Sequence, residues 1–296
     1  MAQAELAIIG GSGFYQMEGL SDRQEVRCRT PFGDPSDAVV LGTLGGRGVA
    51  FLPRHGIGHR LLSSEVPSQA NIYALKTLGV ERIVAINAVG SLRKQIAPRD
   101  LAVPDQLIDQ TRGRASTFFG RGLVAHISFA DPFCPVLRQV LLECARKAGA
   151  TVHPKGTCVV MEGPQFSTKA ESNLYRSQGA DLVGMTSLPE AKLAREAEIC
   201  YASLCCVTDY DVWHESYGTV SAEMILANLA LNSKTAEKVV ALAAQGLPRG
   251  RDCACGGALS DALVTPPHLV PAEIKKELAP IVGKYMPSPS GGGNDG

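Results

Sequence analysis

The sequence has no excess of charge of either sign and no long apolar segment. Its 296 residues include 29 Lys and Arg against 29 Asp and Glu, so the formal net charge is zero. A protein that binds nucleic acid or a membrane surface needs a broad basic field, which this balance does not supply. No apolar run approaches the roughly 20 residues that a bilayer-spanning helix requires. We therefore expect neither nucleic acid nor a membrane among the partners of this chain.

Signals of secretion are also missing. Residues 1–5 carry neither the basic start nor the cleavage-site pattern of a secretory signal. The nine cysteines are an odd number scattered through a long chain, which is typical of buried thiols in a reducing compartment. Both observations predict a cytoplasmic protein.

A dinucleotide-binding fingerprint is absent, although the chain begins in a similar way. The apolar residues 6–9 predict a buried strand, and the glycines after it could present backbone N–H groups and the Ser12 hydroxyl to an anion. Gln16 stands where the fingerprint requires its third glycine, and no continuous helical pattern follows. This disfavours a dinucleotide-dependent oxidoreductase. Two interpretations explain the glycines equally well: a tight turn that binds no ligand, and a turn that binds phosphate.

The sequence does contain the alternation of apolar runs that an α/β protein needs. It is 45% hydrophobic and 20% charged, an ordinary composition for a globular chain with a sizeable core. Predicted strands alternate with predicted helices, and each strand is followed by polar residues, which indicates an α/β sandwich with its ligand at the strand ends. We expect one domain over residues 1–285. The Pro-, Ser- and Gly-rich residues 286–296 predict a disordered tail.

A loop rich in basic side chains follows a predicted hairpin. The apolar runs on either side of Gly45 and Gly46 predict the hairpin, and residues 53–60 after it carry two Arg and two His among glycines. The planar fork of Arg suits phosphate oxygens, and glycine lets a backbone approach a ligand. Anion binding and a merely solvated surface loop remain equally good interpretations.

Two acids close an apolar run that is long enough for a buried strand. The apolar residues 204–207 lead through Thr208 to Asp209-Tyr210-Asp211, and in an extended backbone the two carboxylates point to the same side. Because like charges repel, this arrangement suggests a polar ligand between them or one acid that stays protonated. An isolated Asp-x-Asp more often opens a solvated loop, so the pattern alone leaves both interpretations open.

Six short motifs nevertheless occur in one order along the chain. They are Gly10-Gly11-Ser12-Gly13, Pro53-Arg54-His55-Gly56, Asn87-Ala88-Val89-Gly90-Ser91, Glu162-Gly163-Pro164-Gln165-Phe166-Ser167, Gly184-Met185-Thr186 and Thr208-Asp209-Tyr210-Asp211. With these motifs, and with longer matches at residues 67–76 and 130–134, the chain resembles the 5'-methylthioadenosine phosphorylases. These enzymes belong to the branch of the purine nucleoside phosphorylase family whose members assemble as trimers. The resemblance runs from about residue 6 to at least residue 245.

The resemblance implies a fold, a reaction and an assembly. The fold would be a single-domain sandwich of the phosphorylase type, α/β, with a central mixed sheet flanked by helices. Inorganic phosphate, a co-substrate, would cleave the N-glycosidic bond of methylthioadenosine to give adenine and 5-methylthioribose 1-phosphate. Neither a cofactor nor a metal would be needed. The partners would be nucleoside and phosphate, and the assembly a homotrimer or a dimer of trimers, in which a neighbouring subunit helps to close the pocket.

The resemblance also implies a role for individual residues. Phosphate would be bound by Ser12, Arg54, His55, Asn87, Ala88 and Thr186. Substrate would be bound by Met185 at the ribose, by Phe166 and Ser167 near the purine, and by His126, Ala222, Ile225 and Leu226 around the methylthio group. Asp209 and Asp211 would be catalytic, meeting N7 and the 6-amino group of the base.

The chemistry of these two acids agrees with an adenine base. A protonated Asp209 can donate to N7 as the base leaves, and an ionised Asp211 can accept from an exocyclic amine. The nearest alternative is a phosphorylase of broader range that also takes adenosine, methylthioinosine or 6-oxopurine nucleosides. Relatives for 6-oxopurines have Asn in place of Asp209 and Glu in place of Ser167. One residue favours the broader substrate range. Asn87 stands where many methylthioadenosine enzymes have Thr, and Asn at this position also occurs among methylthioinosine enzymes.

Two further functions stay open on sequence alone. A non-catalytic nucleoside-binding protein would use the same residues, and a hydrolytic nucleosidase would release the base without phosphate.

Cys253-Ala254-Cys255 resembles a C-terminal Cys-x-Cys of some thermophilic members, where it can be oxidised. As a metal site it is incomplete, because two thiols without a second pair do not fill a zinc shell. A disulfide between them would close a strained ring. The sequence therefore predicts free thiols on a loop.

Overall fold

The computed structural model describes residues 4–11, 17, 19–214 and 221–286. Its strands are β1 (Leu6–Gly10), β2 (Ser21–Val26), β3 (Val39–Leu44), β4 (Arg47–Pro53), β5 (Arg82–Ser91), β6 (Leu101–Ala102), β7 (Gln106–Gln110), β8 (Val152–His153), β9 (Thr157–Met161), β10 (Leu182–Gly184) and β11 (Cys200–Asp209). Its α-helices are α1 (Ser68–Thr77), α2 (Pro135–Lys147), α3 (Lys169–Ser177), α4 (Ser187–Glu196), α5 (Ala222–Gly246), α6 (Ala272–Glu277) and α7 (Ala279–Val282). Short 3-10 turns are η2 (Ala254–Gly257) and η3 (Pro267–Leu269).

The strands form one mixed sheet that divides at β5. On one side β5 pairs in parallel with β1, which continues through β4 and β3 to β2. On the other side β5 pairs in parallel with β11, and its last residues pair in antiparallel fashion with β10, which leads to β9 and β7. The predicted hairpin is present as β3 and β4. The glycines between them, Gly45 and Gly46, both have positive φ, as its two-residue turn requires.

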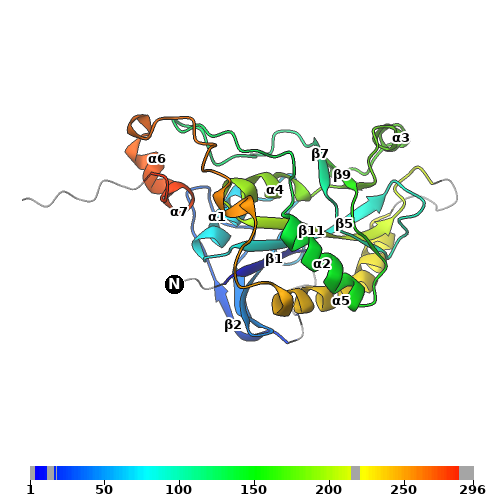
Figure 1. The fold of residues 1–296 in the computed structure, drawn as a ribbon. Helices are drawn as coiled ribbons and strands as arrows, with labels where there is room; N and C mark the ends of the chain where they lie inside the picture. Colours follow the sequence, from blue (N-terminus) through cyan, green and yellow to red (C-terminus); the bar gives the residue numbers. More distant parts are fainter. Residues whose placement is uncertain (1–3, 12–16, 18, 215–220, 287–296) are drawn as a thin grey trace, which may run out of the picture.

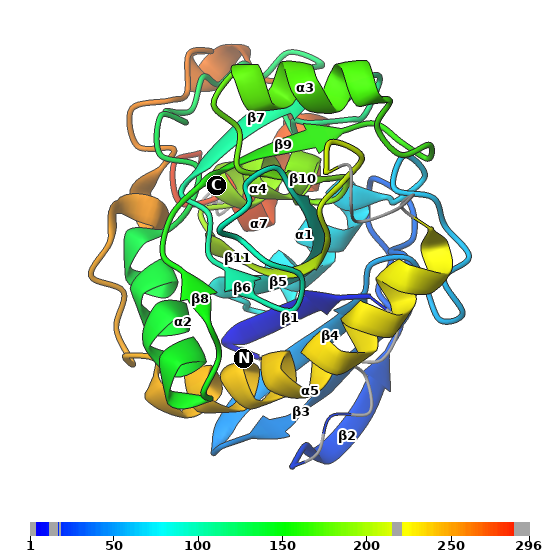
Figure 2. The ribbon, with the colours of Figure 1, turned by 90° about the vertical axis from the view of Figure 1, so that its right-hand side faces the viewer.

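Helices cover both faces of this sheet because the buried strands are apolar on both sides. In β1, Ala7 and Ile9 belong to one hydrophobic cluster, and Leu6 and Ile8 belong to the cluster on the opposite face. Helices α1, α4, α6 and α7 pack in the first cluster, and α2 and α5 in the second (Figure 1). Figure 2 shows α2 and α5 next to each other on their face of the sheet. The predicted α/β fold with a mixed sheet between helices is confirmed.

The chain returns across the molecule after α5. Residues 247–286 pass the beginnings of α2 and β11 and then pair with the loop before α2, where the Val264 N–H donates to the Val124 carbonyl. Met286 is buried in the first cluster, although the sequence placed it in the tail. The rest of the predicted tail, residues 287–296, lies outside the described residues. None of the helices in the described part of the chain has the length and apolar composition that a bilayer-spanning segment requires.

Helix α5 fixes the carboxyl end of β11. The pairing of β11 with β5 becomes irregular between Val207 and Asp209, so carbonyl groups there lose their regular partners. Two amides of α5 donate here: Asn228 Nδ2 to the Thr208 carbonyl at 2.7 Å, and Asn232 Nδ2 at 3.1 Å to the Val207 carbonyl, which also accepts from the Arg99 N–H. These bonds hold the end of the strand, and with it Asp209, against the helix.

Replacing Asn228 by Leu should destabilise the protein by about 1–3 kcal/mol, because the buried Thr208 carbonyl is then left without its donor. Urea unfolding would measure the loss. The control is Lys234→Leu at an exposed position of the same helix, where a change within about 0.5 kcal/mol is expected. Equal unfolding midpoints for the two variants would contradict this role of Asn228.

Candidate active site

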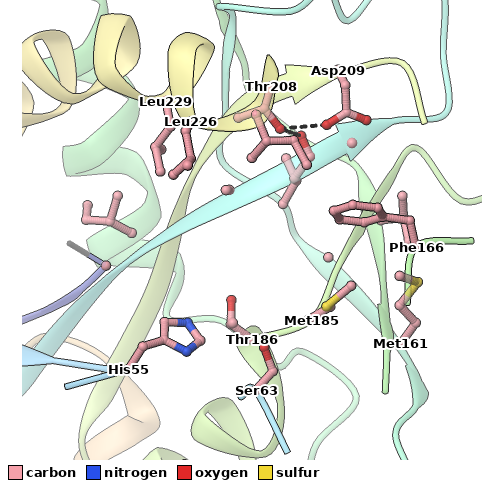
Figure 3. A pocket seen from close by; sticks show the side chains of 18 of the residues that line it. His55, Ser63, Met161, Phe166, Met185, Thr186, Thr208, Asp209, Leu226 and Leu229 are labelled. Atoms are coloured by element: carbon pink, nitrogen blue, oxygen red, sulfur yellow. Dashed lines mark hydrogen bonds between the residues drawn. The ribbon is translucent and has the colours of Figure 1, made fainter. Parts of the chain in front are cut away.

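A pocket opens where the carboxyl ends of the central strands meet. It is lined from the segment after β1 by Gly11, from the loop after β4 by Arg54, His55, His59 and Ser63, from β5 by Ile86, Ala88, Val89 and Gly90, and from β9 and its loop by Met161 and Phe166. The end of β10 adds Val183, Gly184, Met185 and Thr186, the end of β11 adds Thr208, Asp209 and Asp211, and α5 adds Ile225, Leu226 and Leu229. In Figure 3, His55, Thr186 and Ser63 lie on one side of the pocket and Thr208 and Asp209 on the opposite side.

A buried ion pair holds Arg54 in the wall. Its Nε and Nη2 donate to the two carboxylate oxygens of Glu190 at 2.5 and 3.0 Å, and its Nη1 donates to the Ile86 carbonyl at 2.8 Å. The Tyr201 hydroxyl also donates to Glu190, at 3.0 Å. A guanidinium has five N–H groups, so these three bonds leave two for a ligand. Glu190 was missed by the sequence reasoning; the signal was an acid on the apolar, buried face of α4.

His55 is neutral rather than cationic. Its Nδ1 lies 2.9 Å from the Leu61 carbonyl, which can only accept, so we assign the proton to Nδ1 and a lone pair to Nε2. Burial and the charge of Arg54 lower the pKa of His55 to about 4. His59 stacks on this ring with 4.2 Å between centroids. Arg60 points away, to the Ser36 carbonyl. The cationic loop expected from the sequence therefore presents one permanent charge, Arg54, to the pocket.

Thr186 is oriented from behind by Asn87. Asn87 Nδ2 donates to Thr186 Oγ1 at 2.6 Å, so the hydroxyl proton of Thr186 is free to donate to a ligand. Asn87 itself does not line the pocket; its Oδ1 is buried and has no partner among the described residues. Ala88 lines the pocket beside it. Ser12, also predicted to bind phosphate, lies outside the described residues.

Asp209 is a buried acid with two internal donors. Its Oδ2 accepts from the Thr208 hydroxyl and its Oδ1 from the Asp211 N–H, both at 2.7 Å. Burial raises the pKa of Asp209, against the opposing effect of these two bonds. Each oxygen keeps a second lone pair, where a proton can sit and be donated.

Asp211 reaches the same pocket by a different route from the one expected. The strand ends at Asp209, and Asp211 has a φ of +50°, so a turn and not strand alternation brings the two carboxyls together. Burial raises the pKa of Asp211, and the neighbouring Asp209 raises it further. Asp211 Oδ2 is buried without a partner among the described residues, which indicates a site for a ligand donor.

Glycine at position 90 allows this approach of Asp209 to β5. A Cβ added there would lie 2.8 Å from Asp209 Oδ1 and 3.2 Å from Val183 Cγ1. This close approach explains the glycine in the Asn-Ala-Val-Gly-Ser motif.

Phe166 and Met185 form the wall between the two polar ends (Figure 3). Phe166 is 41% exposed, whereas Ser167 is buried behind the wall with its Oγ 3.5 Å from Met161 Sδ. Arg114, which sequence reasoning missed, donates to the Met185 carbonyl at 2.7 Å and to the Glu162 carbonyl at 2.6 Å. It thereby joins the loops after β9 and β10.

Besides Asn87 and Ser167, two further predicted residues do not line the pocket within one chain. His126 is exposed in the loop before α2, where its N–H donates to the Ala262 carbonyl. Ala222, the first residue of α5, is exposed and is not part of the lining. Ile225 and Leu226 do line the pocket, together with Leu229, one helical turn further along.

Comparisons with known proteins match the chain almost over its whole length. The sequence model described as "Phosphorylase superfamily" matches residues 5–244. The S-methyl-5'-thioadenosine phosphorylase of Koribacter versatilis is 55% identical over 284 residues, which cover 96% of this chain and 97% of the relative. The enzyme of the same name from Chloroflexus aurantiacus is 54% identical, over 96% of this chain and 99% of the relative.

Solved structures agree. A methylthioadenosine phosphorylase from an antarctic soil metagenomic library superimposes with a TM-score of 0.90 at 51% identity, covering 95% of this chain and 99% of that one. A variant of the adenosine/methylthioadenosine phosphorylase from Schistosoma mansoni, in complex with methylthioadenosine, gives 0.78 at 37% identity, over 81% and 90% of the two chains. The resemblance inferred from the six motifs is confirmed, and the chain belongs to the phosphorylase superfamily.

Proposed function

We propose that this chain catalyses the phosphorolysis of 5'-methylthioadenosine to adenine and 5-methylthioribose 1-phosphate. The observation that carries the proposal is one pocket with the donors of Arg54 and Thr186 on one side and a buried acid, Asp209, on the other. The names of the relatives, methylthioadenosine phosphorylases at 52–55% identity, support the same reaction. Adenine and the sugar phosphate would enter purine and methionine salvage.

Inorganic phosphate would be bound at the side formed by Arg54, His55 and Thr186. The two remaining guanidinium N–H groups and the Thr186 hydroxyl donate to its oxygens. The neutral His55 accepts at Nε2 from a protonated phosphate oxygen, which a cationic imidazole could not do. An anion held beneath the sugar stabilises the positive charge that develops there and attacks the anomeric carbon. The proposal therefore assigns no step to a protein nucleophile, a cofactor or a metal.

The base would leave with the help of Asp209. Bond cleavage leaves negative charge on the purine, and a protonated Asp209 relieves it by donating to N7. Asp211, through its unpaired Oδ2, accepts from the 6-amino group. An oxygen at position 6 would instead face a carboxylate, and this kind of hydrogen-bond mismatch discriminates strongly between substrates.

The 5' end of the substrate would lie against Ile225, Leu226 and Leu229. These side chains suit a methylthio group better than a hydroxyl. An apolar pocket rejects an added hydroxyl only by about 100-fold, so we expect adenosine to remain a slower substrate.

Adenine release from methylthioadenosine should require phosphate. The measurement is the rate of adenine formation in phosphate-free buffer and with added phosphate, with identification of the sugar phosphate as the second product. Release at an equal rate without phosphate would show a hydrolase, and binding without any release would show a nucleoside-binding protein.

Arg54→Lys is the matched variant for this experiment. Lys keeps a positive charge against the buried Glu190 but loses the planar fork, so the KM for phosphate should rise about tenfold. The KM for methylthioadenosine should change much less. Equal increases in both constants would count against direct contact between Arg54 and phosphate.

Asp209→Asn should lower kcat on methylthioadenosine by about 100-fold or more, because an amide donates a hydrogen bond but does not transfer its proton. The acid acts while protonated, so wild-type kcat/KM should fall as the pH rises through the raised pKa of Asp209. The variant should lose this limb of the profile and gain partial activity on 6-oxopurine nucleosides. Unchanged kinetics on both substrate classes would remove Asp209 from the site.

We further propose that the chain works as a homotrimer, with a dimer of trimers as the larger alternative. His126 and the nearby Val124, Val264 and Leu269 form an exposed surface, and the last three are 43–64% exposed. An adjacent subunit could bring such a surface, with His126, to the mouth of the pocket, where Leu226 is 62% exposed.

Light scattering should then give three or six times the chain mass of 31.2 kDa. His126→Ala should raise the KM for methylthioadenosine, and the control Lys147→Ala, at the exposed last residue of α2, should not. A fully active monomer would contradict the trimer.

A cytoplasmic location also belongs to the proposal. All nine cysteines lie in the described residues and none of them forms a disulfide, which is the state that a reducing compartment maintains.

A further inference from the structure

Four cysteine thiols converge at the end of the sheet opposite to the pocket. Cys134 is the N-cap of α2, Cys200 is the first residue of β11, and Cys253 and Cys255 lie at the turn η2. All four Sγ atoms lie within 4.8 Å of one another. The sequence showed only the Cys-x-Cys pair and predicted that no second pair completes it; this prediction is wrong, because the fold brings Cys134 and Cys200 to the same place.

The spacing of the sulfurs suits a tetrahedral metal shell. Cys253 Sγ lies 3.4 Å from Cys200 Sγ and 3.7 Å from Cys134 Sγ. Four thiolates bound to zinc at about 2.3 Å stand about 3.8 Å apart at the corners of a tetrahedron. A disulfide, by contrast, requires a separation of about 2.05 Å.

The surroundings also suit thiolate ligands. Cys134, Cys200 and Cys255 are buried, whereas Cys253 is partly exposed and offers a path of entry for an ion. The backbone N–H of Leu137 points at Cys134 Sγ over 3.5 Å, so the first turn of α2 supports negative charge on that sulfur. The remaining five cysteines, Cys28, Cys144, Cys158, Cys205 and Cys206, are outside this group, which is the one candidate metal cluster found among the described residues.

We propose that Cys134, Cys200, Cys253 and Cys255 bind one zinc ion as a structural tetrathiolate site. Four protein ligands close the shell and leave no position for a substrate, which is the mark of a structural rather than a catalytic zinc. Binding releases the four thiol protons and transfers no electrons. The site lies at the start of β11 and Asp209 at its end, about 30 Å away at the rise of an extended strand. The ion therefore takes no part in the reaction.

The ion would join three segments that are distant in sequence. It would link the start of α2, the start of β11 and the returning segment 247–286, whose last helices pack against α1. Because the unfolded chain does not preserve this arrangement, zinc binding favours the folded state.

The test uses the full-length chain, produced with added zinc and purified under reducing conditions. Elemental analysis should find one zinc per chain, and denaturation should release one equivalent of zinc to a colorimetric chelator, because the unfolded chain no longer holds the four thiols together. The double variant Cys253→Ser/Cys255→Ser should lose the zinc and unfold at a lower temperature, with kcat at 25 °C within about twofold of wild type. The matched control Cys28→Ser, outside the cluster, should keep the zinc.

Reconstitution supplies a second readout that does not depend on activity. The reduced, metal-free chain with cobalt(II) should show the thiolate-to-cobalt absorption of a tetrahedral sulfur site, and zinc should displace it. The proposal is overturned if the reduced chain retains no zinc against a competing chelator. Three other results would also overturn it. They are an unchanged zinc content in the double variant, iron bound in place of zinc, and a disulfide among these four cysteines in protein that was kept from oxidation.

Discussion

The parallel pairing of β11 with β5 determines where this molecule places its reactive side chains. The two strands run in register from Cys200 beside Arg82 to Val207 beside Val89, and every residue of β11 is buried. Helices cover both faces, so polar groups concentrate at the strand ends. The carboxyl end carries Asp209 next to Gly90, and the amino end carries Cys200, one of the four thiols. The acid of the pocket and the proposed zinc site therefore lie at opposite ends of β11.

Burial acts on the charged groups of the pocket in three different ways, and the partner of each group decides the outcome. Arg54 keeps its charge because the carboxylate of Glu190 is buried with it. His55 has a carbonyl for a partner and Arg54 for a neighbour, so its neutral form is favoured. Asp209 has neutral donors and a second acid beside it, and burial raises its pKa. One apolar environment thus yields a fixed cation, a neutral acceptor and a proton donor, which are the three groups that phosphorolysis requires.

The pocket also depends on residues that touch no ligand in the proposed mechanism. Asn87 turns the Thr186 hydroxyl, Arg114 joins the two loops of the wall, and Asn228 holds the carbonyl before Asp209. Such groups explain why the site tolerates an irregular strand end and a residue with positive φ at Asp211. The strain is offset by hydrogen bonds from neighbouring elements.

The alternation of strands and helices, the order of the six motifs and the family can all be inferred from the sequence, which also predicted about half of the residues that line the pocket. Those features are local: apolar runs, glycines at turns and polar residues directly after strands are written in adjacent positions. Tertiary structure alone decided the partnership of Arg54 with Glu190, 136 residues away, the separation of His126 from the pocket of its own chain, and the turn that brings Asp211 beside Asp209. It also brought Cys134 and Cys200 to the Cys-x-Cys pair. Contacts between distant residues depend on how helices and strands pack, and no local pattern records that packing.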